Sequence, residues 1–560
     1  MKINGATAIC KCLIEQDATT VFGYPGGQII DLFDALYSEP KITQILTSHE
    51  QGAAHAAEGY AKATGKVGVV IATSGPGATN LVTGIADAHL DSIPLVAITG
   101  NVPVSLLGRD SFQEVDIAGI TMPITKHNFI VKNPAELCDA IRRAFYIARS
   151  DRPGPVLVDV PKDVQQAIVD YEAKPVAAPH KPPVQDDITD AVKLINESER
   201  PLIYAGGGCI AANASEKLIE FAKRIKAPVA TSMMGLTAIP TDSEYSAGMI
   251  GMHGHASVAK LADAADLIIA IGARFADRVA GNRSEFCKNA KILHIDIDAA
   301  EIDKNVRSDA HIRGDVVQVL DKLLAVTAQK TNGAMIALNV KLKAESVLPP
   351  CGGRLSPRTV IKCVSDTNVD AVIATDVGQH QMWVAQGYAF KTPRCFLTSG
   401  GLGTMGFGMG AAIGGALGTG KRAILFTGDG SFHMNLNELA TATRLGIDLT
   451  VFVFDNRTLG MVRQWQTLFY GGRYSSTDLD GNKTDFVKAA EAFGARGLTL
   501  DDDADAKATI EKALGMHGVT VVDCKIDKDE FVLPMIPPGK TMKDIITKMP
   551  LTDNNKECGK

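Results

Sequence analysis

Two oxygen-bearing side chains, Asp429 and Asn456, lie 27 residues apart, each just after an apolar run of strand length. The first run, Arg422–Phe426, stops at the glycine-rich turn Thr427–Ser431, where backbone amides can approach a phosphate closely. Mg²⁺ takes a few protein oxygens and keeps its other positions for phosphate and water. The pattern predicts a Mg²⁺–diphosphate site with Asp429 and Asn456 as ligands and a backbone carbonyl near Thr458 as a third.

The segment between the two ligands is expected to return across a sheet as a helix. Asn435 can cap this helix, and Gly446 can end it. Leu449–Phe454 then forms the next strand, so Asn456 reaches a strand's carboxyl end beside Asp429. Ligands bind at this edge in open α/β sheets. A Gly-Asp-Gly turn alone is common and has no such meaning without the spacing to Asn456.

This spacing resembles the thiamine diphosphate signature, in which an aspartate and an asparagine hold Mg²⁺ on the diphosphate. Such enzymes also need a carboxylate against N1′ of the aminopyrimidine for proton exchange. Glu50, which follows an apolar strand ending at Leu46 or Thr47, is the candidate. The alternative for Glu50 is a helix-start glutamate stabilised by the helix dipole.

The whole chain resembles the large catalytic subunit of acetolactate synthase, also called acetohydroxyacid synthase. The motifs that carry the resemblance are Phe22–Gly27, His49–Ala53, Thr73–Asn80, Arg152–Val156, Gly401–Gly408, Gly460–Gln466 and Leu533–Gly539. The resemblance implies decarboxylation of pyruvate and transfer of the two-carbon unit to a second 2-keto acid. Pyruvate as acceptor gives 2-acetolactate and 2-ketobutyrate gives 2-aceto-2-hydroxybutyrate, in branched-chain amino acid biosynthesis.

The resemblance also implies the site residues. The catalytic set is Glu50, Gln113 and Lys126. The thiamine diphosphate set is Gly26, Pro76, Asn80, Val377, Gly378, Gln379, His380, Gly403, Met405, Gly428, Asp429, Gly430, Ser431, Asn456 and Met461, with Asp429, Asn456 and Thr458 on the metal. Gly403 offers a carbonyl to the 4′-amino group, and Met405 is the wedge that bends the cofactor. The substrate set is Phe112, Arg278 and Trp465, although packing also explains a tryptophan.

A flavin is implied for the middle of the chain. The matching residues are Gly206, Gly207, Met252, His253, Arg274, Asp296 and Asp315. In this family FAD is mainly structural, because the net reaction transfers no electrons to an acceptor. A triple glycine after a strand is often only a tight turn. His253 and His255 suggest a metal, but a loop is the preferred interpretation.

Partners also follow from the resemblance. Glu50 of one subunit meets the diphosphate domain of another, which predicts a homodimer or a dimer of dimers with the active site at the interface. A separate small regulatory subunit is expected as well. Gln28, Val104 and Ser105 depart from the family pattern and leave pocket contacts and inhibitor binding open.

Composition narrows the class of protein further. The 560 residues carry a formal net charge of −6 and no lysine or arginine tract, which argues against nucleic acid or an anionic membrane as partner. Apolar runs stay below transmembrane length, and the start lacks a secretory pattern, so we expect a cytoplasmic protein. The ten cysteines are scattered and are expected to be reduced.

Alternating strand and helix patterns predict an α/β protein of three domains, each a mostly parallel sheet flanked by helices. The expected spans are 1–165 for the pyrimidine half, 190–330 for the flavin-like domain, 358–535 for the diphosphate half and 536–560 for a tail. The stretches 165–190 and 330–357, the latter including Pro349–Gly353, are predicted linkers.

Three alternatives remain at this stage. A pyruvate oxidase would share the cofactors but use flavin as the oxidant and release acetate. A catabolic acetolactate synthase would form the same product without FAD. A non-enzymatic Mg²⁺–nucleotide sensor could use the Gly-Asp-Gly turn but gives Glu50 no task.

Overall fold

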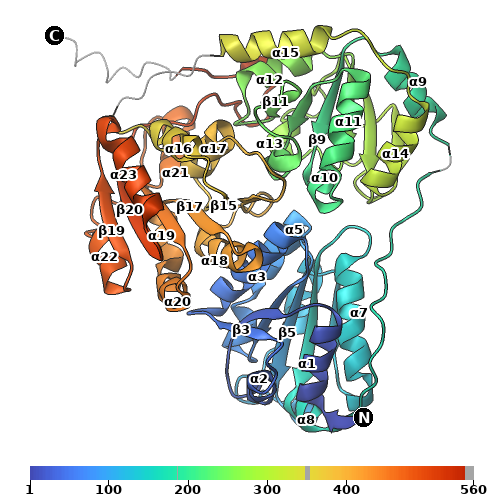
Figure 1. Cartoon of the computed structure of the whole chain (residues 1–560), viewed down its shortest axis with the longest axis vertical. Helices are drawn as coiled ribbons and strands as arrows, with labels where there is room; N and C mark the ends of the chain where they lie inside the picture. The colour runs from blue at the N-terminus through green and yellow to red at the C-terminus, as the bar shows by residue number, and fades with distance from the viewer. Residues whose placement is uncertain (186, 347–352, 549–560) are drawn as a thin grey trace. The chain divides into compact units, whose positions relative to one another are not determined.

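The computed structural model describes residues 1–185, 187–346 and 353–548. The chain divides into two compact units. Unit 1 comprises Met1–Lys181, Arg354–Val384 and Arg394–Lys528, and unit 2 comprises Pro182–Gly353, Ala385–Pro393 and Asp529–Lys560. Unit 1 holds two six-stranded sheets and unit 2 holds one (Figure 1). The described part of the chain has no helix that is both long and apolar enough to cross a membrane.

The first sheet of unit 1 is built from six parallel strands flanked by helices on both faces. Its order is β3 (Thr43–Leu46), β2 (Thr20–Tyr24), β4 (Gly68–Ala72), β5 (Leu95–Asn101), β7 (Pro155–Pro161) and β6 (His127–Ile130). The helices are α1 (Gly5–Glu15), α2 (Ile30–Tyr37), α3 (Glu50–Thr64), α4 (Pro76–Thr79), α5 (Val82–Asp91), α6 (Ile117–Thr121), α7 (Leu137–Arg149) and α8 (Lys162–Gln166). A short antiparallel pair joins β1 (Lys2–Asn4) to β8 (Ile168–Asp170).

Strand residues of this sheet alternate between two buried cores, as the two-residue repeat of a strand requires. On β4, Val69 and Ile71 face the core that α1, α2 and α7 cover. Val70 and Ala72 face the opposite core, which α3 and α5 cover. The continuous apolar run of β4 is therefore explained by helices on both faces.

The other sheet of unit 1 is also parallel. Its order is β16 (Phe396–Leu397), β15 (Ala371–Thr375), β17 (Arg422–Gly428), β18 (Leu449–Asp455), β20 (Val519–Lys525) and β19 (Arg496–Leu500). The helices are α16 (Pro357–Asp366), α17 (Gln379–Gly387), α18 (Phe407–Thr419), α19 (Asp429–Asn435), α20 (Leu439–Leu445), α21 (Gly460–Phe469), α22 (Phe486–Ala492) and α23 (Asp503–Gly515). Both sheets of unit 1 place their strands in the same spatial order, so their carboxyl edges are built alike.

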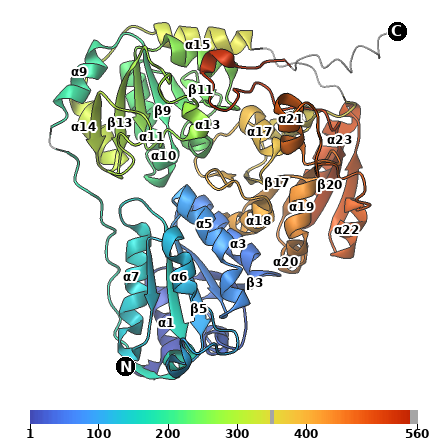
Figure 2. The same ribbon diagram turned by 180° about the vertical axis from the view of Figure 1, so that it is seen from behind.

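Helices α3 and α18 join the two sheets of unit 1 at very close range. A methyl group added at Gly59 of α3 would lie 2.4 Å from the carbonyl oxygen of Ala411. One added at Gly414 of α18 would lie 1.8 Å from the carbonyl oxygen of Ala56. Only glycine permits this approach of the two backbones. Figure 2 shows the two helices side by side from behind.

Unit 2 contains one parallel sheet with its own cores. The strand order is β11 (Ser246–Met249), β10 (Val229–Thr231), β9 (Pro201–Ala205), β12 (Leu267–Ile271), β13 (Lys291–Asp296) and β14 (Ala310–Arg313). The helices are α9 (Thr189–Glu197), α10 (Gly207–Ala211), α11 (Ser215–Ile225), α12 (Ala256–Ala264), α13 (Asp277–Ala280), α14 (Val316–Val326) and α15 (Ala334–Glu345). Counted along the chain, these strands have the doubly wound order 3-2-1-4-5-6.

The three sheets confirm the predicted fold class, whereas two local predictions are wrong. Asn435 does not cap a helix with its side chain, because α19 already begins at Asp429 and the Asn435 amide donates to the carbonyl of Gly406. The predicted linker 330–357 contains α15, whose Met335 and Leu342 pack into a core of unit 2. Residues 347–352 of that linker lie outside the described residues. The domain boundaries themselves stay a prediction.

Candidate functional site

Three neighbouring strands of unit 1 end side by side, and each leads into predicted cofactor residues. β15 leads to Val377–His380, β17 to Gly428–Ser431, and β18 to Asn456. The side-chain amide of Asn456 donates to Gln379 Oε1 at 3.3 Å, and Ser431 Oγ donates to the carbonyl of Val377 at 3.2 Å. The structure therefore brings these predicted residues together at one edge of the sheet. We call this set the diphosphate cluster.

Further predicted residues border the diphosphate cluster. A methyl group placed on Gly403 would lie 3.9 Å from Val377 Cγ1, and one placed on Gly430 would lie 3.8 Å from Met405 Cε. The imidazole of His380 lies against Gly428: a methyl group added at Gly428 would lie 3.1 Å from His380 Nδ1. Burial lowers the pKa of His380 to about 3, so its ring is neutral.

The two predicted metal ligands offer the oxygens that Mg²⁺ prefers. Asp429 is 3% exposed, and its Oδ1 accepts a hydrogen bond from the amide of Gly430 at 2.9 Å. Burial and then the nearby charge of Asp455 raise the pKa of Asp429 to about 7. Asn456 Oδ1 accepts from the amide of Thr458 at 3.1 Å, which leaves its second lone pair for another partner. A carboxylate and an amide oxygen on adjacent strands fit Mg²⁺.

Helix α21 follows this edge directly and carries Met461 and Trp465 one turn apart. The indole of Trp465 is half-buried and meets the ring of Phe469 edge-on, with the centroids 5.6 Å apart. This placement suits either a wall of a substrate pocket or simple packing, so the substrate contact of Trp465 stays a prediction.

A second cluster forms at the carboxyl ends of β2, β3 and β4, and we call it the glutamate cluster. Glu50 is the first residue of α3, and its Oε2 accepts a hydrogen bond from Asn80 Nδ2 at 3.0 Å. Pro76 begins α4 in the same loop as Asn80. Gly26 lies against the side chain of Thr73: a methyl group added at Gly26 would lie 2.5 Å from Thr73 Cγ2. The structure thus places Asn80 on the Glu50 carboxylate, with Pro76 and Gly26 on the neighbouring turns.

The other predicted residues of the first sheet are divided. Gln113 lies beside this loop: a methyl group added at Gly75 would lie 2.9 Å from the backbone carbonyl oxygen of Gln113. The neighbouring Phe112 is 83% exposed. Lys126 points elsewhere, because its ammonium donates to the carbonyls of Ile147 and Ser150 at the end of α7. The structure therefore places Gln113 with the glutamate cluster and Lys126 on a helix terminus.

The predicted flavin residues all belong to unit 2. Gly206 and Gly207 follow β9, and a methyl group on Gly206 would lie 2.0 Å from the carbonyl oxygen of Gly272, which follows β12. The point between β9 and β12 is where the strand order reverses. Arg274 continues from Gly272, and Asp296 ends β13.

The remaining residues predicted for unit 2 have varied surroundings. His253 is 7% exposed, and its Nδ1 has no hydrogen-bond partner among the described residues, while burial lowers its pKa to about 4. The neighbouring Met252 donates its amide to the carbonyl of Arg278 at 2.7 Å, and the Arg278 side chain is 61% exposed. Asp315 caps α14 by accepting from the amide of Gln318. Both ring nitrogens of His255 bond to backbone groups, which supports the loop interpretation over a metal.

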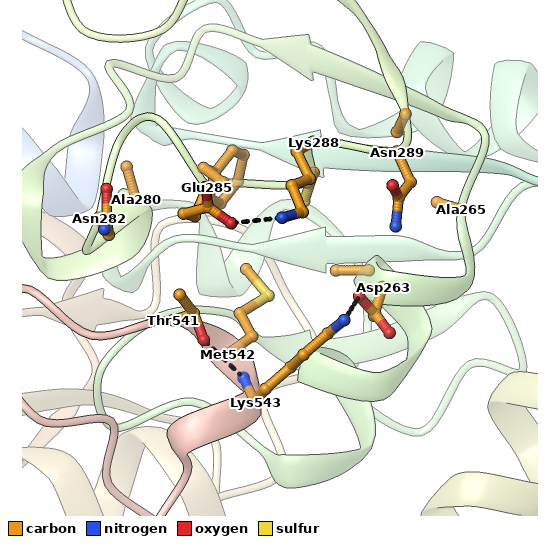
Figure 3. Close-up of a pocket in the computed structure, with 14 residues that line it drawn as sticks. Asp263, Ala265, Ala280, Asn282, Glu285, Lys288, Asn289, Thr541, Met542 and Lys543 are labelled. Carbon is orange, nitrogen blue, oxygen red and sulfur yellow. Dashed lines mark hydrogen bonds and ion pairs between the residues drawn. The ribbon is translucent and has the colours of Figure 1, made fainter.

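Unit 2 also has a partly open cavity of about 100 Å³, shown in Figure 3, which borders the segment Thr541–Lys543. Lys543 pairs with Asp263 at 3.5 Å, and Lys288 pairs with Glu285 at 2.7 Å. None of the predicted flavin residues is among its lining residues. These four charged side chains are paired with each other, and the free thiol of Cys287 also lines the cavity.

A buried charge network in unit 1 was missed by the sequence interpretation. Lys62 of α3 lies 3.0 Å from Glu58 and 2.7 Å from Asp91 of α5. Burial alone lowers the pKa of Lys62, but the charges of Asp91 and Glu58 reverse this and raise it. Burial raises the pKa of Glu58 well above its usual range. His55, Glu58 and Asp87 hold possible metal-ligand atoms within 4.8 Å of one another, but the Lys62 ammonium already supplies the positive charge.

This network holds the loop that contains Gly403. Asp91 accepts hydrogen bonds from the amides of Gly400 and Gly401 at 3.1 and 2.7 Å. Asp87 accepts from Ser399 Oγ at 2.9 Å, and that hydroxyl accepts from the amide of Gly403 at 3.0 Å. A sequence signal existed, because Glu58 and Lys62 lie four residues apart in a helix otherwise rich in alanine and glycine.

Comparison with known proteins agrees with this geometry. Models of thiamine pyrophosphate enzymes match in three places: the N-terminal TPP binding domain at residues 3–120, the central domain at 188–323 and the C-terminal TPP binding domain at 376–524. Fold, site and these matches define the class of thiamine pyrophosphate enzymes, and the matched domains confirm thiamine diphosphate among the predicted cofactors.

Full-length relatives narrow the class. The probable acetolactate synthase large subunit of Methanocaldococcus jannaschii is 46% identical over 97% of this chain and 95% of its own length. The acetolactate synthase large subunit of Corynebacterium glutamicum is 46% identical over 97% and 90%. The acetolactate synthase isozyme 1 large subunit of Escherichia coli K12 is 43% identical over 97% and 98%. The chain belongs to the family of acetolactate synthase large subunits, which confirms the predicted resemblance.

Proposed function

We propose that this chain decarboxylates pyruvate and transfers the two-carbon unit to a second 2-keto acid. Pyruvate as acceptor gives 2-acetolactate, and 2-ketobutyrate gives 2-aceto-2-hydroxybutyrate. The observation that carries this proposal is that the glutamate cluster and the diphosphate cluster occupy equivalent carboxyl edges of two sheets with the same strand order. Thiamine diphosphate, when bound, supplies an electron sink for the pair released as CO₂ leaves.

The chain's own residues take defined tasks in this proposal. Asp429, Asn456 and the carbonyl of Thr458 hold Mg²⁺, while Val377–His380 and Gly428–Ser431 surround the diphosphate. Glu50 holds the proton that is exchanged at N1′ of the aminopyrimidine. Gly403 and Met405 orient the aminopyrimidine ring of the cofactor. Further contacts with the cofactor are proposed for Gly26, Pro76, Asn80 and Met461. Phe112, Gln113, Arg278 and Trp465 are proposed for the substrate pocket. Lys126 is left out of this proposal because its ammonium donates to the carbonyls at the end of α7.

We infer that the site forms between two copies of the chain. Large apolar side chains near both clusters are exposed, and a second copy would cover them. They are Tyr24, Ile30, Leu46, Phe112, Leu402 and Met434. A homodimer or a dimer of dimers follows. The relatives are named large subunits, which supports a separate small-subunit partner for this chain as well.

We also propose that unit 2 binds FAD in a structural role. The doubly wound order binds dinucleotides at its switch point. Gly206 and Gly272 lie at that point, and within the described part of the chain the buried Nδ1 of His253 has no hydrogen-bond partner. Gly207, Met252, Arg274, Asp296 and Asp315 complete the proposed contacts. Flavin absorbance of the purified protein tests this, and a colourless active protein would refute it.

The test of the reaction is product analysis with pyruvate, thiamine diphosphate and Mg²⁺. We expect 2-acetolactate, with no oxygen consumed. Acetate formed with oxygen uptake would instead identify an oxidase, and no turnover would leave only a binding protein. Adding 2-ketobutyrate as a competing acceptor then measures the preference between the two acceptors.

A further inference from the structure

The start of helix α3 is held by a residue from the other sheet of unit 1. The backbone amides of Ser48 and His49 donate to the carboxylate of Glu438, at 3.1 Å to Oε2 and 3.0 Å to Oε1 respectively. Ser48 Oγ also donates to the carbonyl of Asn437 at 3.0 Å. Glu438 ends the short 3₁₀ helix η5 (Leu436–Glu438), just before α20. The turn that precedes Glu50 is therefore hydrogen-bonded to the segment between β17 and β18, the two strands that lead to Asp429 and Asn456.

Glu438 is itself firmly held. It is fully buried, and Thr441 Oγ1 donates to its Oε2 at 2.6 Å. Burial raises the pKa of Glu438, and the hydrogen bonds from Thr441, Ser48 and His49 oppose that shift. A methyl group on Gly52 would lie 2.2 Å from Glu438 Oε1, so the carboxylate lies directly against the first turn of α3. Such a buried carboxylate is retained only with several donors around it.

Glu50 is thus constrained twice. Its backbone follows His49, whose amide is held by the Glu438 carboxylate. Its own carboxylate is oriented by the hydrogen bond from Asn80. We propose that Glu438 is a positioning residue that sets the place of Glu50 within the same chain, an inference that rests on the proposed function of Glu50. Catalytic groups lose much of their effect when displaced by about 1 Å.

The proposal has an unusual genetic consequence. In the proposed dimer, Glu50 of one chain serves the cofactor held by Asp429 of the other. Glu438 and Asp429 both lie in the segment that connects β17 to β18, but Glu438 acts on Glu50 of its own chain. A Glu438 variant should therefore fall in the complementation group of Glu50, whereas a residue that supports the diphosphate cluster should fall in that of Asp429.

The first test uses Glu438→Gln in the full-length protein. Amide hydrogen exchange at Ser48 and His49 should speed up at least about tenfold, because the amide group of glutamine turns a donor toward their N–H groups. Exchange of the C2 proton of bound thiamine diphosphate should slow at least about tenfold, with cofactor Kd changed less than about threefold. Thr441→Val is the second variant, for use if Glu438→Gln does not fold. It keeps the Glu438 carboxylate but removes one of its donors, so it should give smaller changes in both exchange rates.

The control is Asp502→Asn, the same kind of carboxylate-to-amide change at the N-cap of α23, which follows the edge strand β19 of the same sheet. It should leave amide exchange at residues 48–49 and C2 exchange unchanged. Wild-type amide exchange at those residues in both Glu438→Gln and Thr441→Val would overturn the proposal. So would faster amide exchange accompanied by an unchanged C2 exchange rate.

The second test mixes variant subunits. Mixing Glu50→Gln with Asp429→Asn should restore about a quarter of wild-type activity through mixed dimers with one intact site. Glu438→Gln should be rescued by Asp429→Asn and not by Glu50→Gln. The opposite pattern would place Glu438 with the diphosphate cluster and overturn the proposal. Failure of the reference pair would instead contradict the interchain site, and amide exchange would still decide the role of Glu438.

Discussion

The side-chain amide of Asn80 donates a hydrogen bond to Glu50 Oε2 at 3.0 Å. The two residues follow different strands, β4 and β3, so the contact depends on the parallel order of the sheet. An amide donor fixes the plane of a carboxylate and leaves its other oxygen available. Glu50 Oε1 lies 3.3 Å from a methyl position on Gly77, which bounds the same small space. This geometry presents one oxygen of Glu50 for proton exchange.

We expect Glu50→Gln to lower the rate of C2 proton exchange in bound thiamine diphosphate at least about 100-fold. Glutamine keeps the shape and still accepts from Asn80 but cannot exchange the proton. The unfolding midpoint should stay close to wild type. Glu511→Gln, on the exposed side of α23, is the control and should leave exchange unaltered. Normal exchange in Glu50→Gln would remove Glu50 from the catalytic role.

Mg²⁺ affinity should depend on pH through Asp429. Burial and the charge of Asp455 raise its pKa to about 7, so below this pH the metal must displace a proton. Affinity should therefore fall as pH decreases, approaching about tenfold per pH unit below about pH 6. Calorimetry in buffers of different ionisation enthalpy measures both affinity and proton release. Asp429→Asn should bind weakly without this slope; equal affinity for the wild type at about pH 6 and about pH 8 would count against Asp429 as ligand.

The close crossing of α3 and α18 predicts a large stability effect. Gly414→Ala would place a methyl group 1.8 Å from the carbonyl oxygen of Ala56, so the helices must separate. The expected cost is about 1–3 kcal/mol in the free energy of unfolding. Gly515→Ala, where nothing lies within 4 Å, is the control and should change stability by less than about 0.5 kcal/mol. Urea unfolding of both variants compares them, and equal stabilities would contradict the described crossing.

Trp465 is predicted to select the acceptor. Trp465→Leu should lower the ratio of 2-aceto-2-hydroxybutyrate to 2-acetolactate by about tenfold under competing acceptors, because a wider pocket loses contact with the extra methyl group. Phe469→Leu removes only the ring that packs on Trp465 and separates packing from selectivity. An unchanged product ratio in Trp465→Leu, or an equal shift in Phe469→Leu, would leave the indole with a packing role.

Much of the diphosphate cluster could be predicted because its signal is local. The apolar runs of β17 and β18 and the helix end at Gly446, which has a left-handed φ of 63°, follow from short patterns in the chain. Asn456 was therefore placed correctly beside β18. The helix start was placed incorrectly because Asn435 has the right type for a cap, yet Asp429 already begins α19.

The contacts between sheets could not be predicted in the same way. Glu438 and Ser48 are 390 residues apart, and no local pattern pairs them. The same is true of Asp87 and Ser399, which are 312 residues apart. Burial of such charges is decided by tertiary packing, whereas strand and helix periods are decided by neighbours in the chain.

The most direct measurement is the stoichiometry of pyruvate turnover by the purified protein with thiamine diphosphate and Mg²⁺. Two pyruvate molecules should give one 2-acetolactate and one CO₂, and this product should be lost in both Glu50→Gln and Asp429→Asn. Release of CO₂ without 2-acetolactate, or unchanged 2-acetolactate formation in either variant, would contradict the two-cluster active site.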